Sequence, residues 1–261
     1  KNELTELHSV AYLGIPSSSL HNVNFDQEVS RSTVGEPIAS FFGYKADGLF
    51  RSQQEVDAYG LQPNAQPGDI RFRDINNDGV INDEDRTYVG SPHPDLVLGL
   101  NVKLNYKNFD LGMFFNGSFG NDIYNLTKYK TQFFNQSAYN KDSSLLGAWT
   151  PENPNSDIAR LSLDDANNNI RPSSYYVENG SYLKLNNLQL GFTLPEYVLS
   201  AANLRLYVQA SNVFTITDYS GMTPEIGLQN YSSSSRNLDI GVDRGIYPPS
   251  RTFVFGFNLN F

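Results

Sequence analysis

The chain has 261 residues, a formal net charge of -9 and no cysteine. The acidic balance argues against nucleic-acid binding, and the missing cysteines exclude disulfides, a thiolate nucleophile and a cysteine-ligated zinc site. No apolar run reaches the ~18 residues of a membrane helix, which excludes helical spans but not spans made of alternating strands. With 13% aromatic residues, 20 glycines and 13 prolines, the composition favours an all-β protein.

The first part of the chain carries few signals. It begins on Lys1 rather than on methionine, and no signal peptide precedes that residue, so we interpret the chain as a processed or partial product. The segments "KNELTELH" and "EPIASFFGYKADGLF" are candidate strands. Ser52 followed by Glu55 matches a capping box and predicts one short helix.

The segment "DINNDGVINDED" is the one short stretch with the spacing of metal ligands. Its pattern matches an EF-hand calcium loop, with Gly79 at the sharp turn and an aspartate in place of the usual final glutamate. The predicted ligands are Asp74, Asn76, Asp78, the Val80 carbonyl, Asn82 and Asp85. We assign residues 69–90 as a calcium-type loop with a structural ion. The alternative is an Asx-rich turn with solvated carboxylates and no ion.

Strands with a period of two follow this loop. Apolar residues alternate from Leu96 to Tyr106 and again from Phe109 to Phe119, which predicts a hairpin with a tight turn at Lys107 and Asn108. Further alternating stretches start at Leu183 and at Leu204. The first of these changes phase at Asn186 and Asn187, which predicts a β-bulge. The charged residues all fall on the polar faces: Lys103, Asp110, Lys184 and Arg205.

The chain ends on "RTFVFGFNLNF", another strand with one apolar face. Such a face either packs on a second sheet or contacts lipid. Short and long connections alternate along the chain, with long ones at residues 120–173 and 215–250, as in outer-membrane barrels. Aromatic residues stand at the strand ends, where interfacial girdles belong: Tyr106, Phe109, Phe119, Phe192 and Phe261.

The strand count indicates an incomplete barrel. The candidates number about six or seven, whereas single-chain barrels start at about eight strands. We therefore expect the whole of residues 1–261 to form the C-terminal arc of a larger antiparallel transmembrane β-barrel, without a plug domain. Both long connections would be extracellular loops.

No catalytic constellation is present, and we predict that the chain is not an enzyme. The sequence contains neither H-E-x-x-H nor G-x-S-x-G, and Asp164 and Asp165 read as a solvated loop rather than an acid pair. Aromatic residues of the first long connection are candidates for stacking on a substrate or, preferably, for packing against a partner protein. They are Tyr124, Tyr129, Trp149, Tyr175 and Tyr176.

Several quoted segments together resemble a known family. In order along the chain they are "VGEPIASFFGYKADGLF", "GDIRFRDINNDGVINDEDRTYVGSPHPDLVLGLN", "WTPENPNSDIARL", "NGSYLKLNNLQLGF", "NLRLYVQASNVFTITDYSGMTPEIG" and "PPSRTFVFGFNLNF". They resemble the C-terminal part of SusC/RagA-type TonB-linked (TonB-dependent) outer-membrane transporters of Bacteroidetes. The matches cover nearly all of the chain after Val34, and residues 1–33 add little.

The resemblance implies a location in the cell outer membrane and a 22-stranded barrel with an N-terminal plug that this chain lacks. It implies import of oligosaccharides or peptides, a SusD-like surface lipoprotein as partner, and energy from TonB through the missing N-terminal part. It also implies that the assembly machinery reads the terminal strand as an insertion signal. The residues of that signal would be Phe253, Phe255, Phe257, Leu259 and Phe261.

Two other functions stay open on the sequence. A soluble, calcium-stabilised β-sandwich that binds glycans would use the same metal loop and aromatic residues. A passive porin would share the barrel and the loops but would lack a plug and a lipoprotein partner. The substrate is not indicated by any motif.

Overall fold

A computed structural model describes residues 3–5, 11–14, 28–134, 140–195, 198, 202–227 and 238–261. The chain divides into two compact units. The first comprises Lys1–His93, Asp122–Glu178 and Glu225–Ile246, and the second comprises Pro94–Asn121, Asn179–Pro224 and Tyr247–Phe261. Most strand pairs in both units are antiparallel, in agreement with the all-β class that the composition favours.

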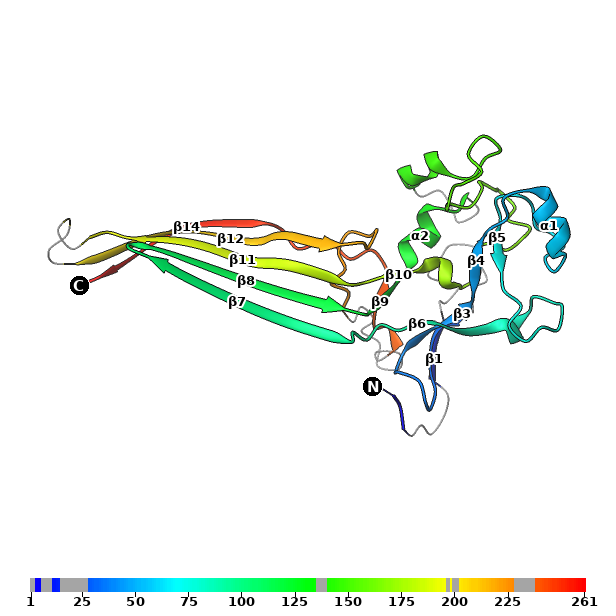
Figure 1. The fold of residues 1–261 in the computed structure, drawn as a ribbon, viewed down its shortest axis with the longest axis horizontal. Helices are drawn as coiled ribbons and strands as arrows, with labels where there is room; N and C mark the ends of the chain where they lie inside the picture. The colour runs from blue at the N-terminus through cyan, green and yellow to red at the C-terminus, as the bar shows by residue number, and fades with distance from the viewer. Residues whose placement is uncertain are drawn as a thin grey trace. The chain divides into compact units, whose positions relative to one another are not determined.

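The second unit is one sheet of five long antiparallel strands, in the spatial order β14-β12-β11-β8-β7. Figure 1 shows them side by side, from green through yellow to red. Their bounds are Leu96–Tyr106 (β7), Phe109–Phe119 (β8), Tyr182–Thr193 (β11), Asn203–Thr217 (β12) and Thr252–Asn260 (β14). All of them are strands that the alternating pattern predicts.

Two local features of this sheet follow from the sequence as expected. Tyr106 pairs with Phe109, so Lys107 and Asn108 form the predicted tight turn, and Lys107 takes a positive φ of 54°. The pairing register of β11 shifts between Leu185 and Asn187 against both of its neighbours, which confirms the predicted bulge.

The first unit contains several small sheets and, among its described residues, two α-helices (Figure 1). One sheet has the order β1-β2-β3-β6, with bounds Ala11–Gly14, Glu28–Ser32, Ser40–Tyr44 and Arg86–Gly90. A second pairs β4 (Ala46–Leu49) with β5 (Ile70–Phe72), and a third joins β10 (Val177–Asn179), β9 (Asp122–Asn125) and β13 (Val242–Asp243). The helices are α1 (Gln53–Tyr59) and α2 (Leu126–Thr131).

Half of the predicted capping box is formed at the start of helix α1. The Ser52 side chain accepts a hydrogen bond from the Glu55 backbone N–H, whereas the Glu55 carboxylate accepts one from the N–H of Arg51 instead of that of Ser52. Gly60 ends the helix with a φ of 68°, a left-handed conformation that glycine adopts without strain. The sequence thus sets both ends of this short helix.

The strand count needs a correction. The segment "EPIASFFGYKADGLF" forms β3 and β4, which pair within the first unit rather than extending the five-stranded sheet. β3 is buried along all of its length, so it lacks the exposed apolar face of the long strands. Of "KNELTELH", the described residues 3–5 are not in a strand, and the rest lies outside the described part of the chain.

The first unit has a core that is rich in aromatic side chains. Tyr176 has no exposed surface, and its ring centre lies 5.7 Å from that of Tyr124 and 6.1 Å from that of Tyr129. Trp149 and Tyr175 pack against this core while partly buried. The assignment of Tyr124, Tyr129 and Tyr176 to a partner surface is therefore wrong, because these rings supply the apolar area that the unit buries.

Candidate membrane-facing surface and metal loop

One face of the five-stranded sheet is apolar from β7 to β14. The register places Leu100 beside Phe115, Leu190 beside Val208, and Val208 beside Phe255. Because strand neighbours share a face, the alternating residues of the five strands join into one surface. Its members on the three central strands include Leu111, Met113, Phe115, Leu188, Leu190, Phe192, Leu206, Val208 and Ala210.

This apolar face is largely exposed, which is unusual for a surface of its size. On the terminal strand β14, Phe253 keeps 70%, Phe255 81% and Phe257 68% of their surface exposed. Leu259 is 41% and Phe261 97% exposed. All five proposed insertion-signal residues therefore lie at the surface of the described structure, and a face of this kind suits an apolar medium better than water.

Aromatic rings stand near the end of the sheet that carries the tight turn. Phe109 and Phe192 are register partners, with ring centres 4.8 Å apart. Tyr106 is exposed beside them on the same side of the hairpin. These positions are the ones that the sequence assigns to an interfacial girdle.

The opposite face of the sheet is polar, and it carries the four charged residues predicted there. Asp110 of β8 and Arg205 of β12 form a bidentate ion pair, with Nε to Oδ1 at 2.8 Å and Nη2 to Oδ2 at 2.5 Å. The pair crosses β11, the strand between them. Lys184 is buried on this face, whereas Lys103 on β7 is exposed.

The loop predicted to bind a metal is folded by hydrogen bonds from its own backbone. The Asp74 carboxylate accepts from the N–H groups of Asn77 and Gly79, at 2.6 and 2.9 Å. Asp78 accepts from the Val80 N–H at 2.9 Å. Gly79 takes a φ of 85°, so the sharp turn stands where the loop pattern requires it.

Asp85 differs from the other proposed ligands because it is fully buried. Its two carboxylate oxygens accept hydrogen bonds from the N–H groups of Ile75 and Asn82, both at 2.8 Å. Asp85 therefore ties the beginning of the loop to its end. It also completes a capping box with Asn82 at a short 3₁₀ turn, Asp83–Asp85.

The donor set fits a hard cation at the exposed part of the loop. Both oxygens of Asp74, and Oδ1 of Asp78, each accept one backbone N–H and keep a second lone pair. Oδ2 of Asp78 accepts from the side-chain amides of Asn76 and Asn82, at 2.9 and 3.5 Å, and Asn76 Oδ1 accepts from the Asp78 N–H at 3.0 Å. Within the described ranges no three acidic or histidine side chains converge as a metal cluster. The metal assignment stays a prediction.

Hydrogen bonds shift the pKa of one carboxyl group in the loop, and burial with a hydrogen bond shifts that of a tyrosine that contacts the loop. Hydrogen bonds from the Asn76 side chain, and next from the Val80 N–H, lower the pKa of Asp78. Tyr44 of β3 donates its hydroxyl to Asp83 at 3.0 Å, which connects the loop to the core sheet. Burial, and next this hydrogen bond, raise the pKa of Tyr44 to about 12.

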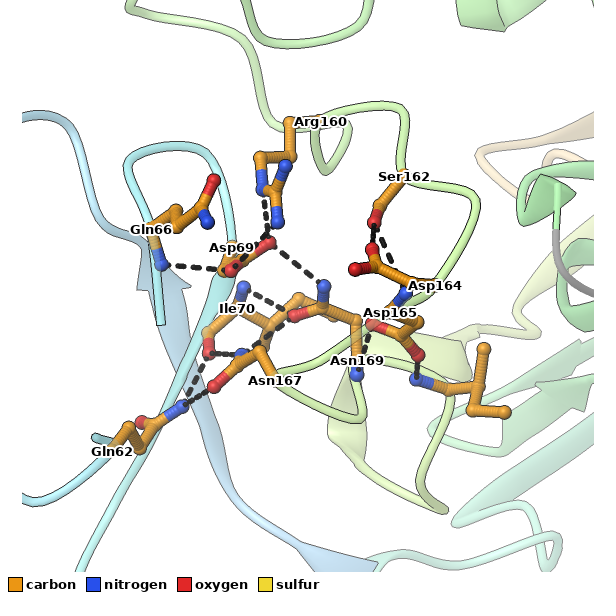
Figure 2. A network of polar contacts seen from close by, with 11 residues as sticks. Gln62, Gln66, Asp69, Ile70, Arg160, Ser162, Asp164, Asp165, Asn167 and Asn169 are labelled. Atoms are coloured by element: carbon orange, nitrogen blue, oxygen red, sulfur yellow. Dashed lines mark hydrogen bonds and ion pairs between the residues drawn. The ribbon is translucent and has the colours of Figure 1, made fainter. Parts of the chain in front are cut away.

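A buried polar network in the first unit was not predicted from the sequence (Figure 2). Asp69 has no exposed surface, and Arg160 donates to it through Nε at 2.6 Å. Asn169 donates to Asp69 at 2.9 Å and accepts from the Ile70 N–H at 2.8 Å. Gln62 donates to the Ile70 carbonyl and accepts from the Phe72 N–H.

The network satisfies backbone groups of β5 that no strand covers. Side-chain amides of Gln62, Asn167 and Asn169 contact Ile70 and Phe72, in place of a neighbouring strand. A buried strand edge without such partners would leave unpaired polar groups. The spacing of residues in the sequence does not predict this network, because its members lie about a hundred residues apart. Gln62 and Asn167, for example, are separated by 105 positions.

Asp165 belongs to this network, which corrects its assignment to a solvated loop. It is 8% exposed and accepts from the N–H groups of Asn169 and Ile170, at 2.8 and 3.1 Å. Burial raises its pKa, and the negative charge of Asp69 adds to the effect. Asp164, in contrast, is exposed and accepts from the Ser162 hydroxyl. The two residues do not form an acid pair.

No helix among the described residues is long and apolar enough to cross a membrane.

The chain is similar to known proteins over nearly all of its length. No protein-family model matches the chain. TonB-dependent receptor P3 of Formosa agariphila is 36% identical over 265 residues, covering 100% of this chain and 26% of that protein. TonB-dependent receptor SusC of Bacteroides thetaiotaomicron is 26% identical, covering 100% of this chain and 23% of that protein.

Solved structures agree on the fold. The RagAB peptide transporter superposes with a TM-score of 0.71 at 22% identity, over 99% of this chain and 25% of that one. The RagAB peptide importer in its open-open state gives a TM-score of 0.68 at 21% identity. The chain thus spans about a quarter of the length of the proteins it matches. Over that quarter it is similar in sequence to proteins named TonB-dependent receptors and has the fold of the matching part of RagAB.

Proposed function

We propose that the chain forms part of the wall of an outer-membrane transporter, with its apolar sheet face in contact with lipid. The observation that carries this function is the continuous apolar face of five long strands, on which Phe253, Phe255 and Phe257 are strongly exposed. β7 has 11 residues, and a strand tilted by about 45° crosses a bilayer with about 9–11.

The two outer strands of the sheet support a larger assembly. β7 and β14 stand at its ends and each has one neighbour among the described strands. In lipid every backbone polar group needs a partner within the protein, so further strands must pair with both edges. The remaining part of the same transporter is the proposed source of these strands.

The exposed face favours a barrel over a soluble sandwich. A sandwich would cover Phe253 and Phe255 with a second sheet, whereas both rings are exposed in the described structure. Similarity to proteins named TonB-dependent receptors favours an energised transporter over a passive porin. On this basis the transporter would draw energy from TonB and pair with a SusD-like lipoprotein.

The cargo is the part of the proposal that rests on relatives alone. One structural neighbour is a peptide transporter, and we propose import of peptides or oligosaccharides as the two substrate classes. Uptake of labelled peptides and labelled oligosaccharides by cells, with and without TonB, distinguishes them. Uptake that is unchanged without TonB would contradict the energised mechanism and favour the porin.

Membrane fractionation of cells that express the full-length protein tests the location. We expect the protein in the outer-membrane fraction, extracted only with detergent and accompanied by a lipoprotein. Deletion of Phe261 should lower its abundance there, whereas Asn260→Ser on the polar face should not. Folded protein that is soluble without detergent would support the sandwich instead.

We further propose that the loop from Asp74 to Asp85 binds one structural calcium ion. Asp74, Asn76 and Asp78 would supply side-chain oxygens and Val80 its carbonyl, with Asn82 direct or through water. Asp85 would hold the loop closed and offer its remaining lone pairs. The exposure of Asp78 and the turn at Gly79 support this assignment.

Calcium titration of the full-length protein in detergent tests the metal site. We expect binding that Asp78→Ala weakens strongly and that Asp164→Ala, which removes an exposed aspartate from another loop, leaves unchanged. Calcium should also slow proteolysis of the loop in the unaltered protein. Equal calcium binding in both variants would assign the loop as an Asx-rich turn.

A further inference from the structure

The polar face of the sheet contains two places where a long side chain lies over a glycine. At the first, the ion pair of Asp110 and Arg205 passes over Gly191 of β11. A Cβ atom at Gly191 would overlap the Asp110 carboxylate and the Arg205 guanidinium. The pair can cross the middle strand only because that position has no side chain.

At the second place, the ring of Tyr207 on β12 lies over Gly256 on β14. The two residues are register partners, and a Cβ atom at Gly256 would overlap the Tyr207 ring and hydroxyl. The Arg205 guanidinium lies 5.3 Å from the centre of the same ring, within range of a cation–π contact. The two places are therefore joined through neighbouring side chains of β12.

We propose that these residues form a register lock that fixes the terminal strand β14 against β12. The register lock is defined as Asp110, Arg205 and Tyr207 lying over Gly191 and Gly256. β11 and β14 each contain a single glycine, and each of these glycines lies under a long side chain of the lock.

The apolar face cannot set this register by itself. A shift of β14 by two residues keeps side chains on their faces, because the strand alternates with a period of two. Such a shift would exchange Phe253, Phe255 and Phe257 for one another opposite β12, so the apolar contacts would change little. On the polar face the same shift would bring Val254 or Asn258 under Tyr207, where a Cβ atom would overlap the ring and force the Tyr207 side chain to move.

A cross-linking experiment on the full-length protein tests the register lock. Gln209 and Val254 are partners in the observed register, and this chain has no cysteine of its own. With both changed to cysteine, we expect an efficient cross-link in protein refolded in detergent. Adding Gly256→Ala should lower the cross-link yield on the order of tenfold, the size of effect expected when an occupied site is overpacked.

Two matched variants separate the lock from general damage. Gly112→Ala, on the polar face of β8 with nothing within 4 Å of its added Cβ, should leave the cross-link unchanged. Tyr207→Ala should restore the cross-link to the Gly256→Ala protein, because the overlapping ring is gone. An equal loss with and without Tyr207, or no loss at all, would overturn the proposal. The readout does not depend on where the cell places the protein, so it stands apart from the proposed function.

Discussion

Phe72 and Phe255 are both phenylalanines in β-strands, yet Phe72 has no exposed surface and Phe255 keeps 81% of its surface exposed. Phe72 lies in a strand of three residues whose edge is covered by amide side chains, and Phe255 lies in a strand of nine residues with one apolar face. The first unit packs a cluster of apolar side chains into a core that is closed to water, as a globular domain does. The second unit presents them, which is reasonable only if its surroundings are apolar.

The largest expected effect comes from emptying the core of the first unit. Phe72→Ala should destabilise this unit by about 3–5 kcal/mol, because it leaves a cavity among buried side chains. Limited proteolysis of the full-length protein, with cleavage mapped to each unit, measures the effect. The matched change Phe255→Ala should leave the first unit intact. If both changes opened the first unit equally, the division into two differently packed units would be wrong.

The next-largest effect should come from placing a charge on the exposed apolar face of the second unit. Phe255→Arg should cost about 2–4 kcal/mol if the side chain sits near mid-membrane. Val254→Thr on the polar face should cost little. Refolding of full-length protein into lipid vesicles, followed by denaturant titration, gives both values. A soluble sandwich would instead lose all folding from the arginine, since its core would be dry.

The sequence predicts those parts of the structure whose pattern is visible within a short stretch of residues. The hairpin at Lys107 and the bulge after Leu185 were predicted correctly, because a period of two and its phase change are visible within a dozen residues. The same holds for the apolar and polar faces of the sheet. The first unit gave no such pattern, since β3 and β5 are short and fully or mostly buried.

The missed site residues have the same cause. Asp69 and Asn169 meet only in the fold, at a sequence separation of 100, so no spacing rule brings them together. The sequence predicts Asp165 in a solvated loop, and Tyr176 on a partner surface because it lies in a long connection and aromatic residues suit interfaces, whereas hydrogen bonds and ring packing bury both. Of the metal loop, the sequence predicted the turn at Gly79 but not the buried brace formed by Asp85.

A smaller effect should follow from opening the amide network. Asn169→Ala removes the acceptor for the Ile70 N–H and the donor to Asp69, and unsatisfied buried groups cost about 1–3 kcal/mol. Hydrogen exchange of the Ile70 and Phe72 amides should speed up in this variant. Asp164→Asn, an exposed change nearby, serves as the control. Unaltered exchange at Ile70 would mean that the network does not protect the strand edge.

The smallest effect concerns Tyr44 and has a size that depends on pH. Tyr44→Phe removes the hydrogen bond to Asp83 and should cost about 1 kcal/mol at neutral pH. The folded protein keeps the Tyr44 proton up to about pH 12, whereas an unfolded tyrosine loses it near its ordinary pKa of 10. The stability from this proton is complete below pH 10 and is lost as the pH rises to about 12.

Denaturant titrations of the unaltered and Tyr44→Phe proteins across this range check the prediction. The difference in the free energy of unfolding should shrink between pH 10 and about 12, because only the unaltered protein loses this contribution. A constant difference would mean that Tyr44 ionises alike in the folded and unfolded states. The titration concerns the first unit alone and leaves the sheet of the second unit as an internal reference.

The most direct test of the central claim is a scan of lipid contact along β14. Single cysteines are introduced in turn from Phe253 to Asn258 in the full-length protein, labelled with a fluorophore and reconstituted into vesicles containing lipid-attached quenchers. We predict quenching that alternates with a period of two, strong at Phe253, Phe255 and Phe257 and weak at Val254, Gly256 and Asn258. Equal quenching at all six positions, or quenching only by a water-soluble agent, would contradict the account.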